Sequence, residues 1–108
     1  MADFLIERSA SNRFYYVFRA SNYEPVIHGE EHTTKAACQG SIDAIKRNAA
    51  YESQYTRWQT GVHFYFNLKA ANGEKIGSNE AYNSAQGREN GTNVVKRDAS
   101  TALMEDRS

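Results

Sequence analysis

The sequence is poor in cysteine, proline and aliphatic residues, and it has no excess of charge of either sign. Its 108 residues include one cysteine, one proline, 13 basic and 13 acidic residues. Balanced charge removes the usual electrostatic basis for coating DNA or a membrane surface. The lone Cys38 excludes an intramolecular disulfide. Together with three scattered histidines it makes no structural zinc set, so we expect neither metal nor cofactor.

Long hydrophobic runs are also missing. The chain reaches charged residues at Asp3 and Glu7, before an apolar segment of signal-peptide or membrane-spanning length can form. With an unpaired cysteine, this predicts a cytoplasmic protein without membrane contact. Leu, Ile, Val and Phe total only 18 residues, but seven Tyr, five Phe and one Trp supply area for burial. We therefore expect a folded, aromatic-rich protein with Trp58 as a core or inter-half anchor.

The chain repeats itself at a spacing of 50 residues. Residues 14–49 align without a gap on residues 64–99, and nine of these 36 positions are identical. Two copies at this period indicate a duplicated unit. We expect a single domain over residues 1–108, made of repeats at about 1–50 and 51–100 with a short tail at 101–108.

Each repeat has the pattern of three strands followed by a helix. Residues 14–20 and 64–70 alternate between aromatic or apolar and more polar side chains, as half-buried strands do. Shorter strands are expected at 4–8, 52–59 and 74–78. Asn72-Gly73 is typical of a tight hairpin turn, whereas Tyr23 at the equivalent of Gly73 predicts a looser or strained turn. Thr33 or Thr34 should cap the first helix, and Asn83 with Gln86 resembles a capping box for the second.

These patterns predict an α+β fold of two tandem β-β-β-α repeats. A pseudo-two-fold axis would relate the repeats, which share one antiparallel sheet with a helix from each packed on it. Residues 101–104 are expected to add a short strand, so that terminal strands are exchanged, and residues 105–108 are expected to be disordered. A unit of about 50 residues is marginal alone, which favours a shared core.

The second copy resembles the repeat of the YegP-like family, small bacterial proteins with a tandemly repeated domain of unknown function. The resemblance rests on residues 64–74 (FYFNLKAANGE) with Ile76, Ser78, Glu80 and Tyr82. The first copy departs from it at Tyr23, Gly29 and His32. The resemblance implies an α+β fold in which two repeats, or two subunits, build one sheet with exchanged terminal strands. It implies no activity, substrate or catalytic residue.

One candidate surface comes from the outward face of the two main strands. Tyr15 and Tyr65 occupy equivalent positions there, as do Arg19 and Lys69. An aromatic ring beside a cation can stack a base and touch a phosphate. The same residues can instead form ordinary exposed cross-strand pairs, which the balanced charge favours.

A second repeated polar set surrounds the turns and is interpreted as structural. Asn suits tight turns, and an acid before a helix suits its positive end. The set comprises Asn22, Glu24, Asn72, Gly73, Glu74 and Glu80.

No catalytic motif occurs, so we predict a non-enzymatic structural or protein-interaction module, with a protein partner or self-association through sheet edges. A nucleic-acid-binding module using the outward Tyr/basic face is the alternative. An enzyme without a recognisable motif is a third hypothesis.

Overall fold

A computed structural model describes residues 2–79 and 81–108 and has the predicted order of elements, three strands and a helix in each half. The first half contains β1 (Asp3–Arg8), β2 (Phe14–Arg19), β3 (Pro25–His28) and α1 (Lys35–Asn48). The second half contains η1 (Glu52–Gln54), β4 (Tyr55–Thr60), β5 (His63–Lys69), β6 (Lys75–Ser78) and α2 (Ala85–Asp98). The chain ends with η2 (Ala99–Thr101) and β7 (Leu103–Asp106).

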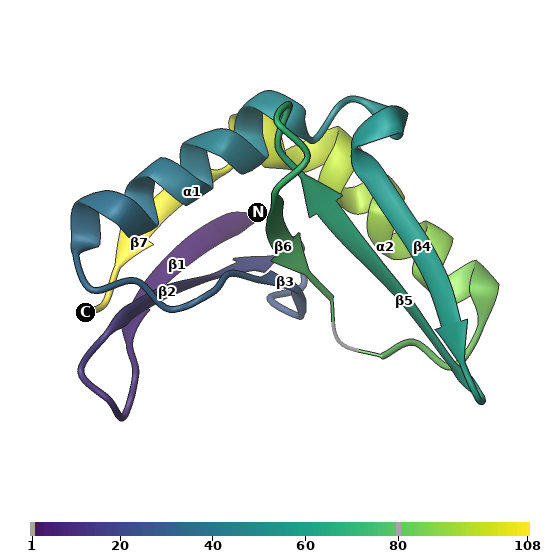
Figure 1. Ribbon diagram of the computed structural model, residues 1–108, viewed down its shortest axis with the longest axis horizontal. Coiled ribbons are helices and arrows are strands. Elements are labelled where there is room, and N and C mark those ends of the chain that lie inside the picture. The colour runs from purple at the N-terminus through teal and green to yellow at the C-terminus, as the bar shows by residue number, and fades with distance from the viewer. Residues whose placement is uncertain (1, 80) are drawn as a thin grey trace.

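All the strands form one sheet in the order β4-β5-β6-β3-β2-β1-β7 (Figure 1). The halves join where β3 and β6 pair, with His28 opposite Ser78. The predicted α+β fold is therefore confirmed, with one correction: the sheet is not antiparallel throughout, because β7 runs parallel to β1. Thr101 and Ala102 lie close to Ala2, so the tail enters the sheet at the start of β1 and follows its direction.

The C-terminal tail forms a strand, as predicted, but the strand spans Leu103–Asp106 and not residues 101–104, because Thr101 belongs to η2. β7 pairs with β1 from Leu103 to Asp106, and the Arg107 N–H donates to the Ile6 carbonyl at 2.8 Å. The prediction of disorder for residues 105–108 is thus wrong. The Asp106 carboxylate also forms an ion pair with Lys35 of α1 at 2.6 Å, which holds the tail against the helix.

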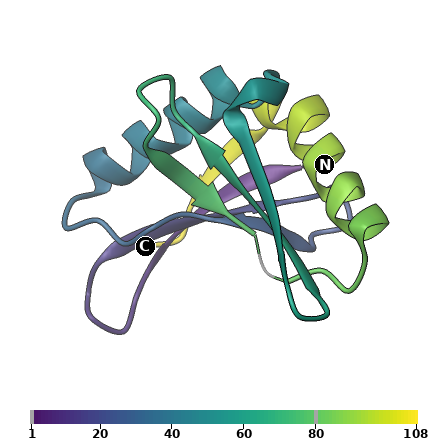
Figure 2. The ribbon, with the colours of Figure 1, turned by 45° about the vertical axis from the view of Figure 1, so that its right-hand side comes forward.

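Both helices lie on the same side of the sheet (Figure 2). Thr34 caps α1 by accepting a hydrogen bond from the Ala37 N–H at 3.1 Å. Ser84 caps α2 through the Gly87 N–H at 2.9 Å, so the capping box predicted to start at Asn83 is wrong by one residue. The Ser84 hydroxyl accepts from a backbone N–H of the first helical turn that has no partner within the helix, so Asn83 is not needed as a cap. Among the described residues, no helix is long and apolar enough to cross a membrane.

The two halves share one hydrophobic core, and Tyr16 lies across their junction. Its ring is fully buried, and its hydroxyl donates to the Ile76 carbonyl of the other half at 2.6 Å. Gly77 makes this possible, because a Cβ there would stand 2.9 Å from the Tyr16 hydroxyl and 2.6 Å from Ile27. The equivalent of Tyr16 is Phe66, which packs against Tyr82 within its own half.

Candidate functional site

The side of the sheet opposite the helices, here called the helix-free face, carries the four residues of the predicted candidate surface. Residues directly opposite each other on neighbouring strands share a face, so strand register identifies its members. Tyr15, Arg19, Tyr65 and Lys69 all lie there and are half-buried. Their neighbours on the paired strands are Asp3, Leu5, Glu7 and Val17 in the first half, and Thr56, Trp58, Thr60, His63 and Asn67 in the second.

In the first half, Arg19 is held by residues of the same half. Its Nε and Nη2 atoms donate to both carboxylate oxygens of Asp3 at 2.9 and 2.6 Å. This bidentate pair lowers the pKa of Asp3 below its usual value. The Tyr23 ring covers the guanidinium, with the Arg19 Cζ 4.8 Å from the ring centroid. Asp3 and Tyr23 therefore take up the hydrogen-bonding and stacking capacity that a ligand would need from Arg19.

Tyr23 reaches this position in a left-handed backbone conformation, with φ of 67°. Such a φ is uncommon for a bulky residue, and the equivalent Gly73 adopts φ of 87°. The strained turn predicted from Asn22-Tyr23 is confirmed. The cation–π contact between the Tyr23 ring and the Arg19 guanidinium offsets this backbone strain.

Tyr15 is also occupied within its own half. It lies directly opposite Glu7 in the sheet, on the same face as that carboxylate. Burial, and then the nearby negative charges of Glu7 and Glu31, raise the pKa of the Tyr15 hydroxyl. Glu31 in turn accepts hydrogen bonds from Ser9 and, at 2.8 Å, from Ser11. Carboxylates therefore accompany both predicted residues of the first half.

The second half has an aromatic stack in place of these carboxylates. Trp58 is opposite Tyr65, and their rings stack with centroids 5.4 Å apart and an interplanar angle of 12°. His63 meets the Tyr65 ring edge-on at 6.5 Å. Trp58 is 39 % exposed, so its expected role as a core or inter-half anchor is wrong: it lies on the outward side of β4, where no helix packs.

Trp58 and His63 are the members of this stack that sequence reasoning missed. The signal was present in the hairpin, because Gly61 and Val62 form a two-residue loop between β4 and β5. With Thr60 and His63 as the closing pair, counting back places Trp58 opposite the outward Tyr65. The strand register set by this loop, and not the 50-residue repeat, identifies Trp58 and Tyr65 as a cross-strand pair.

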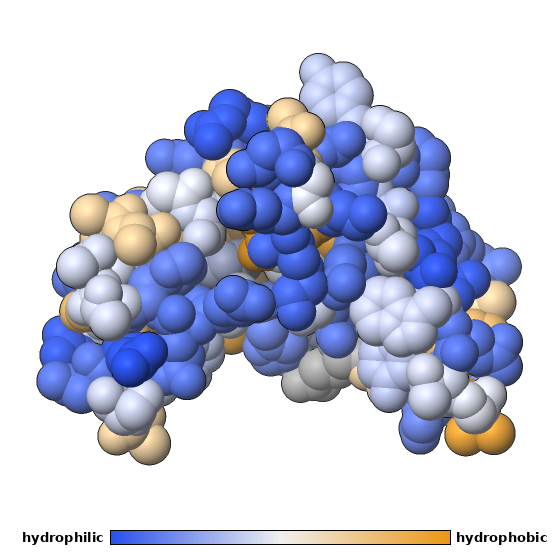
Figure 3. Space-filling model, viewed as in Figure 1, coloured by the Kyte–Doolittle hydropathy of each residue, from blue (hydrophilic) through white to orange (hydrophobic). Residues whose placement is uncertain are grey.

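We call the group Trp58, His63, Tyr65 and Lys69 the open face. In Figure 3, side chains of intermediate hydropathy gather over the β4–β5 hairpin, and a hydrophobic spot marks its tip, where Val62 is 74 % exposed. None of the described residues that β4–β6 place on this side carries a carboxylate. Asp3, Glu7 and Glu31 correspond to Gln54, Trp58 and Ala81 in the second half.

The repeated turn residues form hydrogen bonds that hold the turns. The Asn22 side-chain oxygen accepts from the Glu24 N–H at 3.1 Å, and Asn72 accepts from the Glu74 N–H at 3.0 Å. These are the same Asx turns in both halves. Gly73 supplies the positive φ described above, and Glu80 lies outside the described residues. This geometry supports the structural interpretation of the set.

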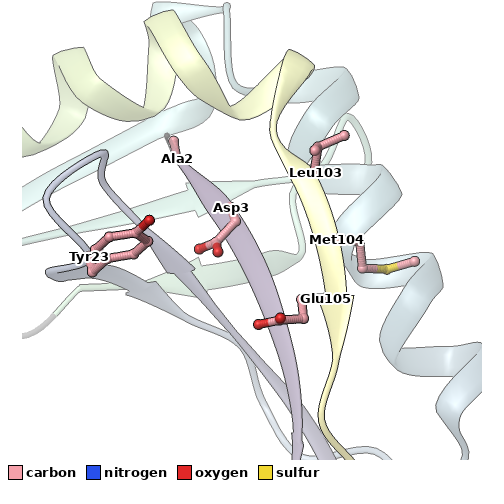
Figure 4. Close-up of a pocket in the computed structure, with 6 residues that line it drawn as sticks. All are labelled: Ala2, Asp3, Tyr23, Leu103, Met104 and Glu105. Carbon is pink, nitrogen blue, oxygen red and sulfur yellow. The ribbon is translucent and has the colours of Figure 1, made fainter.

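The concave sites of the molecule are shallow. One of about 360 Å³ lies between β7, the start of β1 and Tyr23. Figure 4 shows the Asp3 and Glu105 carboxylates pointing toward Tyr23, and Leu103 and Met104 pointing away from it. Asp3 is already bound to Arg19, and Glu105 to Arg107 at 2.8 Å. This pocket is therefore lined by groups with partners of their own.

Two further groups that can be reactive in other proteins have structural roles here. The Ser41 hydroxyl lies 2.9 Å from His32 Nε2, where the second half has the pair Gly91 and Tyr82. A Cβ at Gly91 would stand 2.2 Å from the Tyr82 hydroxyl, so both pairs are ways of packing a ring onto a helix. Cys38 is fully buried, and burial raises the pKa of its thiol. The described residues contain no cluster of three potential metal ligands.

The two edges of the sheet are closed in different ways. β7 covers β1 at one edge. At the other edge, the Tyr55 N–H donates to the Glu52 carbonyl. Arg57 of β4 points to the helix side, where it binds Glu52 and Glu89. An inward-pointing charge on an edge strand discourages pairing with another chain, and self-association through sheet edges stays a prediction.

Comparison with known proteins finds the repeat and the fold together. A family model described as "Domain of unknown function (DUF1508)" matches residues 9–55 and again residues 61–106. The UPF0339 protein YegP of Shigella flexneri is 36 % identical over 104 residues, covering 95 % of this chain and 94 % of its own. A UPF0339 protein of Bordetella pertussis is 30 % identical over 109 residues, covering 100 % of this chain and 98 % of its own.

Two solution NMR structures have the same fold. The structure of yegP from E. coli, a protein of unknown function, superposes with a TM-score of 0.91 at 34 % identity, covering 98 % of this chain and 92 % of its own. The structure of a UPF0339 protein from Shewanella oneidensis gives a TM-score of 0.92 at 29 % identity, covering 97 % of this chain and 90 % of its own. The resemblance to the YegP-like family, stated from the sequence, is confirmed.

Proposed function

The chain belongs to the DUF1508 family, whose domain is of unknown function, and from that premise we propose that it is a non-enzymatic protein-interaction module that binds through the open face. The observation that carries the proposal is the exposed Trp58–Tyr65 stack on a side of the sheet without helices. Tryptophan and tyrosine are enriched at the energetic centres of protein interfaces. The proposed compartment is the cytoplasm, because Cys38 is a free, buried thiol.

The contrast between the halves supports the open face over the first half. Arg19 is bound to the Asp3 carboxylate and Tyr15 lies beside Glu7 of the same half, whereas Trp58 and Tyr65 stack on each other without a neighbouring carboxylate on β4–β6. A ligand that binds the first half has to displace internal ion pairs. A ligand that binds the open face displaces only water.

Nucleic-acid binding is the second candidate, favoured by one specific observation. The Lys69 ammonium forms no ion pair with a described residue. It lies on the same face as the Trp58–Tyr65 stack, onto which nucleobases can stack in turn. Against this, the register places one further cation opposite Lys69, Lys75 of β6, and its ammonium already forms an ion pair with Glu30 at 3.6 Å, whereas strong phosphate binding draws on several cations.

Affinity capture from a bacterial lysate, with and without nuclease treatment, tests both candidates. We expect a protein that the wild type retains after nuclease treatment and that both Trp58→Ala and Tyr65→Ala lose. Tyr51→Ala is the matched control, because Tyr51 is 61 % exposed but lies before η1, outside the open face. Equal capture by Trp58→Ala and wild type would overturn the proposal, and capture that disappears with nuclease would favour the second candidate.

A further inference from the structure

We propose that the open face binds a proline-rich segment of a partner protein in the polyproline II conformation. This inference rests on the proposed function and names the chemistry of the partner. Proline-rich segments dock on surfaces formed by neighbouring aromatic side chains, and they bind at low entropic cost because their conformation is preformed.

The Trp58–Tyr65 stack supplies such a surface. Tyr65 covers one side of the indole, with 12° between the ring planes, and among the described residues no other ring or cation lies over the indole. Trp58 is 39 % exposed, so the second side of the indole is available for a pyrrolidine ring, which is compact and apolar. Val62, 74 % exposed at the hairpin tip, extends the apolar surface in the direction of the strands.

The hydrogen-bonding groups of the open face complement a ligand that offers acceptors only. Trp58 Nε1 and the Tyr65 hydroxyl are donors, and neither forms a hydrogen bond to a described residue. A proline-rich segment lacks most of its backbone N–H groups and retains its carbonyls. The absence of carboxylates among the described residues of this face, in contrast to the first half, fits a ligand without donors or cations.

Two other occupants fit the open face less well. A single-stranded nucleic acid also offers acceptors, but beside Lys69 the register adds only Lys75, which is already paired with Glu30, for a chain of phosphates. An added β-strand would pair along the outer edge of β4, but the Arg57 side chain of this edge strand points to the helix side and binds Glu52 and Glu89, and an inward-pointing charge discourages such pairing. A neutral polyproline II segment requires neither.

The occupant has to come from another protein. The single proline of this chain is Pro25, which begins β3 and lies opposite Arg19 in the sheet. No segment of the chain is therefore proline-rich, and self-occupation by a second copy does not fit the chemistry.

The fluorescence of Trp58 tests the inference directly, because Trp58 is the single tryptophan of the chain. The full chain is titrated with a ten-residue proline peptide, a ten-residue Gly/Ser peptide and a ten-nucleotide thymidine strand. We expect a saturable change in Trp58 emission with the proline peptide alone. It should be nearly insensitive to salt, and roughly tenfold weaker in Tyr65→Ala, as for the loss of one aromatic contact. Tyr51→Ala should bind as the wild type does.

Several results would overturn the inference, and they separate it from the proposed function. A response to thymidine that disappears as salt is raised favours nucleic acid. Equal responses to the proline and Gly/Ser peptides show that proline is not recognised. If no peptide changes the emission while Tyr65→Ala still loses its captured protein, the partner uses another chemistry and the proposed function stands. Circular dichroism of each variant shows whether a lost response reflects lost folding.

Discussion

The two halves of the molecule have the same order of elements but differ on the helix-free face. In the first half, Asp3 and Tyr23 bind Arg19, and Glu7 lies opposite Tyr15. In the second half, the corresponding Gln54, Trp58 and Gly73 leave Lys69 and Tyr65 accessible. A duplicated unit has thus retained its core in both copies, and only one copy presents an unoccupied aromatic surface. Equivalent positions in a repeat do not imply equivalent roles.

The comparison depends first on whether the halves fold as one unit. Phe18 and Leu68 are equivalent, and both are fully buried. We expect Phe18→Ala to lower the free energy of unfolding by about 3–5 kcal/mol and Leu68→Ala by about 2–5 kcal/mol. In each variant, urea unfolding followed by Trp58 fluorescence should coincide with unfolding followed by far-ultraviolet circular dichroism. Trp58 reports on the second half, so Phe18→Ala in the first half is the decisive case.

Separate transitions in Phe18→Ala, with Trp58 remaining in its native environment while helical signal is lost, would contradict a shared core. We expect the two transitions to coincide because the Tyr16 hydroxyl donates a hydrogen bond to the Ile76 carbonyl across the junction. In addition, α1 packs on β2 of the first half and on β5 and β6 of the second. A unit of about 50 residues has little stability alone.

The ring-on-helix pairs sharpen the comparison at a smaller scale. His32 with Ser41, and Tyr82 with Gly91, are two solutions to the same packing problem. We expect His32→Tyr alone to lower the free energy of unfolding by about 1–3 kcal/mol, because the larger ring meets Ser41. Adding Ser41→Gly should recover about 1 kcal/mol or more relative to the sum of the single changes. A double-mutant cycle by chemical denaturation measures this coupling, and simple additivity would show that the pairs are not interchangeable.

The turns give a still smaller contrast. Gly73→Tyr places a side chain at φ of 87° beside Lys69, which has no Asp3 equivalent to fix it, so we expect a loss of about 1 kcal/mol. Tyr23→Gly removes a similar strain but also the stack on Arg19, and the two effects should cancel to within about 0.5 kcal/mol. Chemical denaturation measures both. If the two substitutions lower the free energy of unfolding equally, Tyr23 stabilises the first half by more than its contact with Arg19.

The sequence predicts the features that repeat and misses those that depend on register or long-range pairing. Alternation in residues 14–20 and 64–70 identified the main strands, and Tyr23 identified the strained turn. The position of β7 depends on β1, nearly 100 residues away, and four exposed side chains give no periodic signal of burial. The partners of Arg19 and Tyr65 depend on hairpin registers that the 50-residue shift does not contain, since β1 and β4 are offset by one residue more.

The two sheet edges provide the smallest expected effect and a test by pH. Arg57 and Lys96 lower the pKa of Glu52 from its usual 4.5 to about 2. A carboxylate with a depressed folded-state pKa stabilises the protein above its unfolded value and loses that contribution as pH falls through the folded one. Glu52→Gln should therefore flatten the fall in the free energy of unfolding between pH 4.5 and 2, and the pH-dependent difference from wild type should vanish below about pH 2. The effect is small because Glu52 is 62 % exposed and solvent screens the pair. Glu24→Gln is the control, because Glu24 is an exposed turn residue. An equal flattening in both variants would show that the ion pairs of Glu52 with Arg57 and Lys96 do not stabilise the β4 edge as β7 stabilises the other edge.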